Sequence, residues 1–532
     1  MIIRSHYTPL TQLPLQKFAD GARNSLIYME TASPKRKNRR FGVELGEPGS
    51  FEHALCHMVD HGLDLTGLLA RIRNDDGGAP AYDPAVLIKI VLLAYSRGII
   101  SSRKMEAACR DNVMFMVVSG ESQPDHSTLA AFVSKLGDEV AKLFAQVLVL
   151  CDRQGLIGRE MFAIDGVKLP SNASKARSGT RADFQRQLGK MEKQALRMIE
   201  AQRQADAQPL DEAQRHSRKL ERLQRETEQL RQWLNEHPKD RLGVKGDPIM
   251  SNLTDNESAK MATDKGVIQG YTGVATVDDK HQIIVDAQAF GTGSENALLA
   301  PVVDATQDLR APHTVITADA GYHSKAGLEH LAKNGVSAFI ADNDYRKRDA
   351  RYDGQDHHKE KGSALHDKSE QPEQPQPKLF GPADFHWNKD TNICICPAGQ
   401  RMRGSGKPCQ IKDYMVVKFQ GLTQSCLPCQ WRAQCLRTPD KTQTRQVAFV
   451  QGKVISDQPD ALQLMRQRID SDEGKRMITR RFATVEPVFG NLRYNKRLSR
   501  FTLRSKAKVD GQFKLYAMMH NIEKFAGSGY VQ

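Results

Sequence analysis

Two short apolar runs in this chain each end at an aspartate that is followed closely by a glycine. The first covers 161–164 and precedes Asp165 and Gly166, and the second covers 314–318 and precedes Asp319. Runs of this length and composition predict buried strands. Open α/β sheets bind their ligands at the carboxyl ends of strands, but aspartate also follows strands because it suits turns. Each aspartate alone therefore fits either a binding site or a plain turn.

The segments around these runs predict a mixed α/β sheet. A β-hairpin is expected over 270–289, and a further strand over 336–340. Helical patterns cover 294–309 and 324–334, so strands and helices follow one another in the order of an α/β fold. We expect the first strand to end at Asp165. A charged helical arm over 182–240 then interrupts this first part of the core, which spans 156–341.

An all-helical domain is expected ahead of the sheet, over 51–155. Asp83 followed by Pro84 predicts the start of one helix, and Asp125 predicts the start of another. Short capped helices of this kind are compatible with a helix-turn-helix DNA-binding module, and equally with any small helical bundle. Residues 1–50 are predicted to form a flexible basic segment.

The formal net charge of +14 points to an anionic partner. A basic enzyme without a polymer partner is the alternative. From Arg466 to Lys508 there are thirteen Lys and Arg against four Asp and Glu, which favours nucleic acid. No apolar run approaches the roughly 18–20 residues of a membrane span. The first residues lack the features of a signal peptide, so we expect a cytoplasmic protein without a membrane partner.

Six of the nine cysteines lie between Cys394 and Cys435. They fall in a strand-rich insert expected over 380–455, after a linker over 342–379 that is predicted to be disordered. Clustered cysteines without a secretion signal indicate metal binding or reduced thiols. Pair spacing favours one set as ligands of a structural zinc ion, and the alternative is that they only pack the insert. That set is Cys394, Cys396, Cys426 and Cys429.

A third acidic residue, Glu486, lies inside a basic helical segment over 456–532. An apolar stripe continues around it, and arginines surround it. Glu486 could be an ion-pair partner of these arginines, or a metal ligand beside phosphate-binding arginines. Pro487 disfavours a helical conformation at Glu486, so the helix is expected to kink or to restart there.

Together, these segments resemble the three catalytic blocks of DDE transposases. The similarity is closest to the insertion-sequence group called the eleven-eighty-two family. Residues 82–136 are also similar to the N-terminal domain of these transposases, so the resemblance covers most of 50–525. The three blocks read Ile164-Asp165-Gly166, Ala318-Asp319-Ala320-Gly321-Tyr322 and Val485-Glu486-Pro487-Val488-Phe489-Gly490-Asn491-Leu492-Arg493.

This resemblance implies an RNase H-like mixed-sheet core, interrupted by the helical arm and by the cysteine-bearing β-rich insert. Asp165, Asp319 and Glu486 would be the catalytic residues and would bind two Mg²⁺ ions, which Mn²⁺ could replace. The activity implied is DNA transposition: binding of double-stranded element ends, cleavage and strand transfer into target DNA. A homodimer or larger assembly, associated with the nucleoid, would carry it out.

Basic residues near Glu486 are expected to contact DNA phosphates, although the family pattern is not fully matched. Related transposases carry a lysine seven residues after the glutamate, where this chain has an arginine, and the upstream arginines are slightly out of register. Another RNase H-like nuclease and an inactive, domesticated transposase that only binds DNA are the alternatives. The expected DNA contacts are Arg480, Arg481, Arg493, Lys496 and Arg497.

Overall fold

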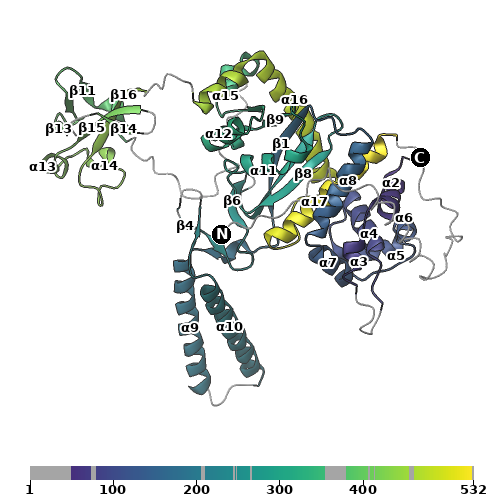
Figure 1. The fold of residues 1–532 in the computed structure, drawn as a ribbon. Helices are drawn as coiled ribbons and strands as arrows, with labels where there is room; N and C mark the ends of the chain where they lie inside the picture. Colours follow the sequence, from purple (N-terminus) through teal and green to yellow (C-terminus); the bar gives the residue numbers. More distant parts are fainter. Residues whose placement is uncertain are drawn as a thin grey trace. The chain divides into compact units, whose positions relative to one another are not determined.

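The computed structural model describes residues 49–529, except for 73–79, 205–209, 244–245, 247, 264–265, 354–378, 405–407, 412–413 and 454–459. Two compact units make up the chain: 1–348 with 465–532, and 349–464 (Figure 1). The predicted flexible segment over 1–50 lies almost entirely outside the described residues. So does most of the linker predicted over 342–379.

A mixed sheet forms the centre of the first unit, in the strand order β10-β9-β1-β7-β6, with β8 also paired to β7. β1, β7 and β8 are antiparallel neighbours, whereas β9 is parallel to β1 and β10 is parallel to β9. The bounds are β1 Met161–Pro170, β6 Ala259–Thr263, β7 Gly266–Asp278, β8 Ile284–Phe290, β9 Val315–Ala318 and β10 Ala338–Ile340.

The prediction that β1 ends at Asp165 was wrong. β7 pairs with β1 as far as Pro170, opposite Gly270, while β9 pairs with β1 only as far as Ile164. Asp165 is therefore the first residue of β1 beyond its parallel neighbour. The apolar run stops at Asp165 because one neighbour ends there, and the strand continues because the other supplies its hydrogen bonds.

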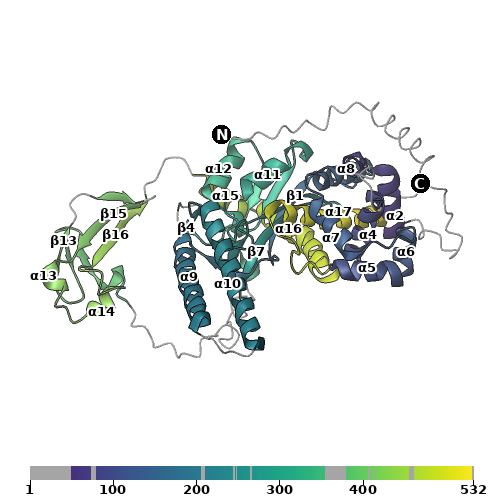
Figure 2. The same cartoon turned by 90° about the horizontal axis from the view of Figure 1, so that it is seen from below.

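Helices cover both faces of this sheet (Figure 2). α11 (Leu299–Ala305) is shorter than the helix predicted over 294–309, and α12 (Lys325–Lys333) matches its prediction closely. α16 (Asp472–Gly490) packs against β1, β9 and β10. α17 (Lys506–Gly527) packs against β8 and also against the N-terminal helices α2, α4 and α8, so it joins the sheet to the helical region.

The N-terminal region is helical, as predicted. Asp83 accepts a hydrogen bond from the Ala85 amide at 2.8 Å, and Asp125 accepts one from the Ser127 amide at 2.7 Å. These bonds confirm both predicted helix starts. The helices are α2 Phe51–His57, α3 Thr66–Leu69, α4 Pro84–Ser96, α5 Ser102–Asp111, α6 Val113–Val118, α7 His126–Lys135 and α8 Glu139–Arg153, with a π-helical turn over Met58–Gly62.

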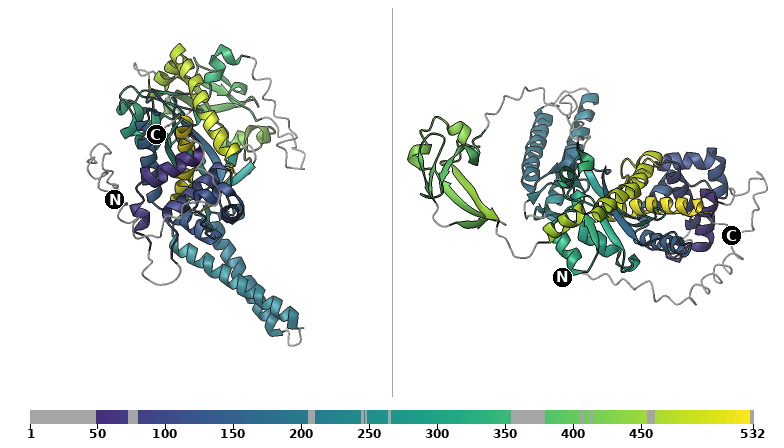
Figure 3. Two further views of the ribbon diagram at one scale, coloured as in Figure 1. Left: turned by 90° about the vertical axis from the view of Figure 1, so that its right-hand side faces the viewer. Right: turned by 90° about the horizontal axis from the view of Figure 1, so that it is seen from above.

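The predicted helical arm is an antiparallel pair, α9 (Arg181–Gln204) and α10 (Leu210–Glu236) (Figure 3). Phe184, Leu230 and Leu234 form a small buried cluster where the pair meets the rest of the unit. The exposed positions of the two helices are mainly polar or charged where the structure describes their side chains, which is typical of a solvated helical pair. Short strands β2 (Ser178–Gly179) to β5 (Ser251–Asn252), with β3 (Arg241–Leu242) and β4 (Pro248–Ile249), flank the arm.

The second unit is strand-rich and contains the segment 380–455. Its sheet has the order β11-β12-β13-β15-β14, with β16 paired to β15. A small apolar core includes Phe385, Cys394 and Phe419. The elements are β11 His386–Asn388, β12 Ile393–Ile395, β13 Arg401–Gly404, β14 Cys409–Ile411, β15 Tyr414–Gln420, α13 Thr423–Cys426, α14 Arg432–Cys435 and β16 Gln446–Lys453.

After the second unit the chain returns as helices, beginning with α15 (Ala461–Asp470) and continuing through α16, a π-helical turn over Asn491–Asn495 and α17. Within the described ranges, no helix is both long and apolar enough to cross a membrane.

A buried histidine holds α17 against the sheet. His520 is 1% exposed, and its Nε2 lies 2.9 Å from the carbonyl oxygen of Gln282. Its Nδ1 is buried and has no hydrogen-bond partner among the described residues. The pKa of His520 is lowered to about 4, mainly by burial. The hydrogen bond to the Gln282 carbonyl raises this pKa, and the positive charges of Lys524 and Lys496 lower it further. His520 is therefore neutral at pH 7.

We expect His520 to make the fold sensitive to mild acid. As pH falls from about 6.5 toward 4, the unfolded state binds a proton that folded His520 does not, so stability decreases. The loss approaches about 3 kcal/mol at full effect. In His520→Gln, which keeps a donor toward Gln282, urea midpoints should fall less between about pH 7 and pH 4.5. An equal fall in both proteins would contradict this assignment.

Candidate active site

The sheet places the two predicted aspartates side by side. β1 and β9 run parallel, and Ile164 is in register with Ala318. Asp165 follows Ile164, and Asp319 follows Ala318, so both aspartates come directly after the last paired position of the two strands. Asp319 caps a 3₁₀ turn over Ala320–Tyr322 and accepts a hydrogen bond from the Gly321 amide at 3.0 Å. The carboxyl end of β9 and the middle of β1 thus form one edge of a site.

Glu486 reaches this site from α16, the helix that packs against β1 and β9. Pro487 neither kinks the helix into two elements nor restarts it, because α16 is continuous from Asp472 to Gly490. A proline lacks the N–H that would bond the carbonyl four residues earlier, at Ala483. That carbonyl instead accepts a hydrogen bond from Gln282 Nε2 at 3.2 Å. The helix therefore tolerates Pro487 because a neighbouring side chain replaces the missing donor.

Electrostatic coupling shows that the three carboxylates are neighbours. Burial raises the pKa of Asp165, and Arg481 opposes this. The negative charges of Asp319 and Glu486 raise the pKa of Asp165 further. The side chain of Asp165 is 25% exposed and Glu486 is exposed, so the group opens to solvent.

Arg481 connects α16 to β1 at this position. Its side chain is 3% exposed, and Nη2 lies 3.1 Å from Asp165 Oδ1. Nε and Nη2 also donate to the carbonyl oxygen of Ile164, at 3.3 and 3.2 Å. Arg481 was predicted to contact DNA, but a buried guanidinium engaged by two groups of β1 does not present a surface to DNA.

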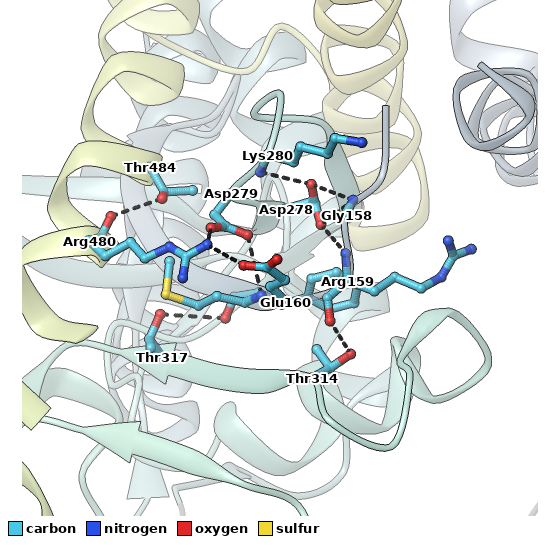
Figure 4. A network of polar contacts seen from close by, with 12 residues as sticks. Gly158, Arg159, Glu160, Asp278, Asp279, Lys280, Thr314, Thr317, Arg480 and Thr484 are labelled. Carbon is cyan, nitrogen blue, oxygen red and sulfur yellow. Dashed lines mark hydrogen bonds and ion pairs between the residues drawn. The ribbon is translucent and has the colours of Figure 1, made fainter. Parts of the chain in front are cut away.

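Two more of the predicted DNA contacts are engaged within the protein. Figure 4 shows Arg480 reaching from α16 to Asp279 and to Glu160, whose Oε2 lies 2.8 Å from Nη2. Lys496 pairs with Glu523 and donates to the carbonyl oxygen of Ser96 at 3.1 Å. Both side chains join elements of the first unit.

Arg493 and Arg497, the other two predicted contacts, are exposed. Arg493 lies over the ring of the exposed Tyr494, at 5.7 Å from its centre. These two residues keep the surface position that a phosphate contact requires.

A fourth carboxylate, Glu295, belongs to the site and was missed in the sequence. It lies between β8 and α11. A methyl group added at Gly321 would overlap Glu295 Oε2 and lie 3.1 Å from Asp319 Oδ1, and one added at Gly166 would lie 3.1 Å from Glu295 Oε1. Burial raises the pKa of Glu295, the charge of Asp319 adds to this, and Lys168 opposes it. Glu295 does not directly follow a strand, because β8 ends at Phe290, so its only signal was the glycine beside each aspartate.

Tyr322 contributes a hydroxyl group to the same place. The residue is 0% exposed, and its hydroxyl has no hydrogen-bond partner among the described residues. A methyl group on Gly166 would lie 2.9 Å from this oxygen. Burial raises the pKa of Tyr322, and the charges of Glu295, Asp165 and Asp319 add to this effect. Tyr322 is therefore a neutral donor beside a group of carboxylates.

The composition of the site fits divalent cations with oxygen ligands. Four carboxylates face two cations, Arg481 and Lys168, which leaves an excess of negative charge. As they stand, no three His, Cys, Asp or Glu side chains among the described residues form a group that could hold a metal ion. Mg²⁺ commonly takes only one or two protein carboxylates and completes its shell with water and substrate phosphates. A solvent-open group of carboxylates is compatible with this mode of Mg²⁺ coordination.

We expect Arg481 to matter far more for folding than its neighbour Arg480. Arg481→Ala leaves Asp165 without its counter-ion, and breaking a buried pair costs about 3–5 kcal/mol. We expect the lower end of that range, because Asp165 keeps some exposure. Arg480 is 43% exposed but pairs with Asp279, which is 5% exposed, so Arg480→Ala should cost less, about 1–2 kcal/mol. Urea unfolding of both variants measures this, and equal losses would contradict a buried role for Arg481.

Two protein-family models match the chain. "Transposase domain (DUF772)" matches residues 44–135, which carry the helices α2 to α7. "Transposase DDE domain" matches residues 395–526, which include Glu486 and α16. No curated protein matches the chain significantly.

The two matches flank the segment that holds Asp165 and Asp319, and the charges of Asp319 and Glu486 both act on Asp165. DDE transposases act on DNA and generally use divalent metal ions. The chain is a DDE-type transposase of an insertion element.

Proposed function

We propose that this transposase cleaves DNA at the ends of its own insertion element and joins them to target DNA, with Asp165, Asp319 and Glu486 as the catalytic residues. One observation carries the proposal: Asp165 and Asp319 follow a paired position on parallel strands, and both Asp319 and Glu486 act on the charge of Asp165. The residues have the order and the setting that the three catalytic blocks of the family predict.

Strand order supports an RNase H-like core. Three antiparallel strands, β8-β7-β1, are followed by β9 and β10, which continue parallel to β1. One acidic residue lies on the central strand, one follows the neighbouring parallel strand, and one lies on a helix that returns to the sheet. From the resemblance of the three sequence blocks, we also propose that the chain belongs to the eleven-eighty-two family.

We propose that Asp165, Asp319 and Glu486 hold two Mg²⁺ ions, with Mn²⁺ as a substitute. Bound there, such ions stabilise the charge that grows on the entering and leaving oxygens of a phosphoryl displacement, and lower the pKa of the attacking water. The first cleavage would free a 3′-hydroxyl at each element end, and that hydroxyl would then attack the target DNA.

The protein's own groups prepare this site. Arg481 fixes the orientation of Asp165 through two contacts to β1. The Tyr322 hydroxyl is a buried donor beside the carboxylates, with no other partner among the described residues. Glu295 is half-buried and adds negative charge beside Asp319. It would therefore strengthen the attraction of the site for bound cations.

DNA would bind along the basic stretch that follows Glu486. Arg493 and Arg497 are exposed there, and so are Arg500 and Arg504. Such side chains bind phosphates without reading the base sequence. We leave Arg481 out of this surface because it is buried. Recognition of the element ends is assigned to the N-terminal helices, and pairing of two ends requires at least two protomers, so we propose a homodimer or larger assembly at the nucleoid.

Removal of any one catalytic carboxylate should abolish cleavage while DNA binding persists. In Asp165→Asn, Asp319→Asn and Glu486→Gln, we expect Mg²⁺-dependent cleavage of element-end DNA to fall at least about a thousandfold, because metal ions contribute several kcal/mol to such transition states. Gel analysis of cleaved and joined strands measures this. Glu473→Gln, an exposed substitution in the first turn of the same helix, serves as the control.

Cleavage that persists in Asp165→Asn and Asp319→Asn would contradict the proposed catalytic site. Cleaved ends that never join to a target would instead favour a simple nuclease.

Glu295→Gln tests the fourth carboxylate. The change keeps the shape of the side chain and removes its charge, so we expect cleavage to fall by about 10–100-fold, as for groups that support metal ligands. The Mg²⁺ concentration for half-maximal cleavage should rise as well. Glu329→Gln, at an exposed position of α12, should change neither quantity. An unaltered Mg²⁺ dependence in Glu295→Gln would remove Glu295 from the site.

A further inference from the structure

Four cysteines of the second unit line a single pocket: Cys396, Cys426, Cys429 and Cys435. They come from three places in the chain: the turn after β12, the end of α13 with the turn that follows it, and the end of α14. All are free thiols.

We propose that Cys396, Cys426, Cys429 and Cys435 bind one structural zinc ion, with loss of their thiol protons. Tetrahedral Zn²⁺ with four cysteine ligands, two of them in a C-x2-C pair, is a common structural site in proteins. This set differs from the one that pair spacing favoured, in which Cys394 stood in place of Cys435.

Cys394 has another role. It is 0% exposed and lies in the apolar core of the unit. Its Sγ is 3.8 Å from Met402 Sδ. Cys394 belongs to strand β12, whereas Cys396 lies just after the strand, where the chain turns toward the pocket. Neighbouring positions in the sequence therefore separate into a packing residue and a ligand.

The backbone of the pocket is arranged as tight turns. The Gly399 amide donates to the Cys396 carbonyl at 2.8 Å, and the Cys396 amide donates to the Gln400 carbonyl at 2.9 Å. Gly399 has a φ of 73°, which favours glycine. Close packing directs the second sulfur as well, because a methyl group added at Gly421 would overlap Cys426 Sγ. Two of the ligands are thus held at turns, as in zinc knuckles.

The segment that carries three of the ligands has little to hold it otherwise. α13 and α14 are four residues long each, which is too short for a helix to be stable alone. Arg432 secures them by donating to four backbone carbonyls at 2.7–3.0 Å, including that of Cys426. A metal ion coordinated by cysteines from three segments would link these segments and stabilise the same region.

Charge in the pocket also favours thiolates. Arg445 lines it, and its Nε is buried without a hydrogen-bond partner among the described residues. Four thiolates on one Zn²⁺ carry an excess negative charge that a guanidinium beside them offsets. As they stand, the thiols do not form a closed metal site. Changes of χ1 between staggered rotamers are the movement that would bring the sulfurs together.

Zinc content of the full chain tests the proposal directly. Purified under reducing conditions, the protein should hold about one zinc per chain by mass spectrometry of the metal, and Co²⁺ in its place should give the intense visible bands of a tetrahedral thiolate site. Cys429→Ser and Cys435→Ser should each reduce zinc to a trace. Cys409→Ser, on strand β14 and outside the pocket residues described, should keep it.

Three outcomes would overturn the proposal. Wild-type protein without zinc, or with these cysteines joined as disulfides by peptide mapping, would exclude the site. Zinc retained in Cys435→Ser but lost in Cys394→Ala would show the other ligand set. The Asp165→Asn variant should hold as much zinc as the wild type, so a failure of cleavage and a failure of zinc binding are separable.

Discussion

The guanidinium of Arg481 lies between helix α16 and strand β1, where water barely reaches it. A buried cation requires a partner, and its partners here are the carboxylate of Asp165 and the carbonyl of Ile164. This contact sets the position of α16 along β1, and Glu486 lies on the same helix little more than one turn away. The distance between Asp165 and Glu486, the two carboxylates proposed as catalytic, therefore depends on the buried Arg481. Asp165 also stabilises the fold, because neutral Asp165 would leave the Arg481 guanidinium without its counter-ion.

Pro487 shows how the remainder of the site adapts to this constraint. A proline inside a helix removes a hydrogen bond and costs about 3 kcal/mol or more. Gln282 compensates with a hydrogen bond to the freed Ala483 carbonyl, and its own carbonyl and side-chain oxygen bond His520 and Lys524 on α17. Gln282 has a φ of 60°, an uncommon conformation for a residue with a side chain. One turn between β7 and β8 therefore secures both C-terminal helices against the sheet.

Local features of the fold were predictable because they depend on neighbours in the sequence. Asp83 and Asp125 cap helices within three residues of themselves, and the apolar runs before Asp165 and Asp319 identify β1 and β9. The length of β1 was not predictable, because β7 provides its hydrogen bonds from a hundred residues away in the chain. The place of Glu295 beside the aspartates and the ligand role proposed for Cys435 were missed for the same reason. Each reaches its site through a loop or a short helix whose path depends on contacts distant in the sequence, and neither stands in a periodic pattern.

Contacts within the first unit hold together the two points where the chain leaves for the second unit and returns from it. The chain leaves the sheet after β10 and returns at α15, and Arg348 bonds both Asp342 on the outgoing segment and Asp470 on the returning one, at 2.5 and 2.8 Å. The Ile340 amide also meets Met465 Sδ at 3.3 Å. Because these contacts hold the two ends together within the first unit, a long insert adds little entropy cost to the core. Asp319 and Glu486, which we propose share one site, can therefore lie far apart in the sequence. The family match over 395–526 begins in the second unit and ends in the first. It follows the sequence, whereas the sheet and its helices come from segments on both sides of the insert.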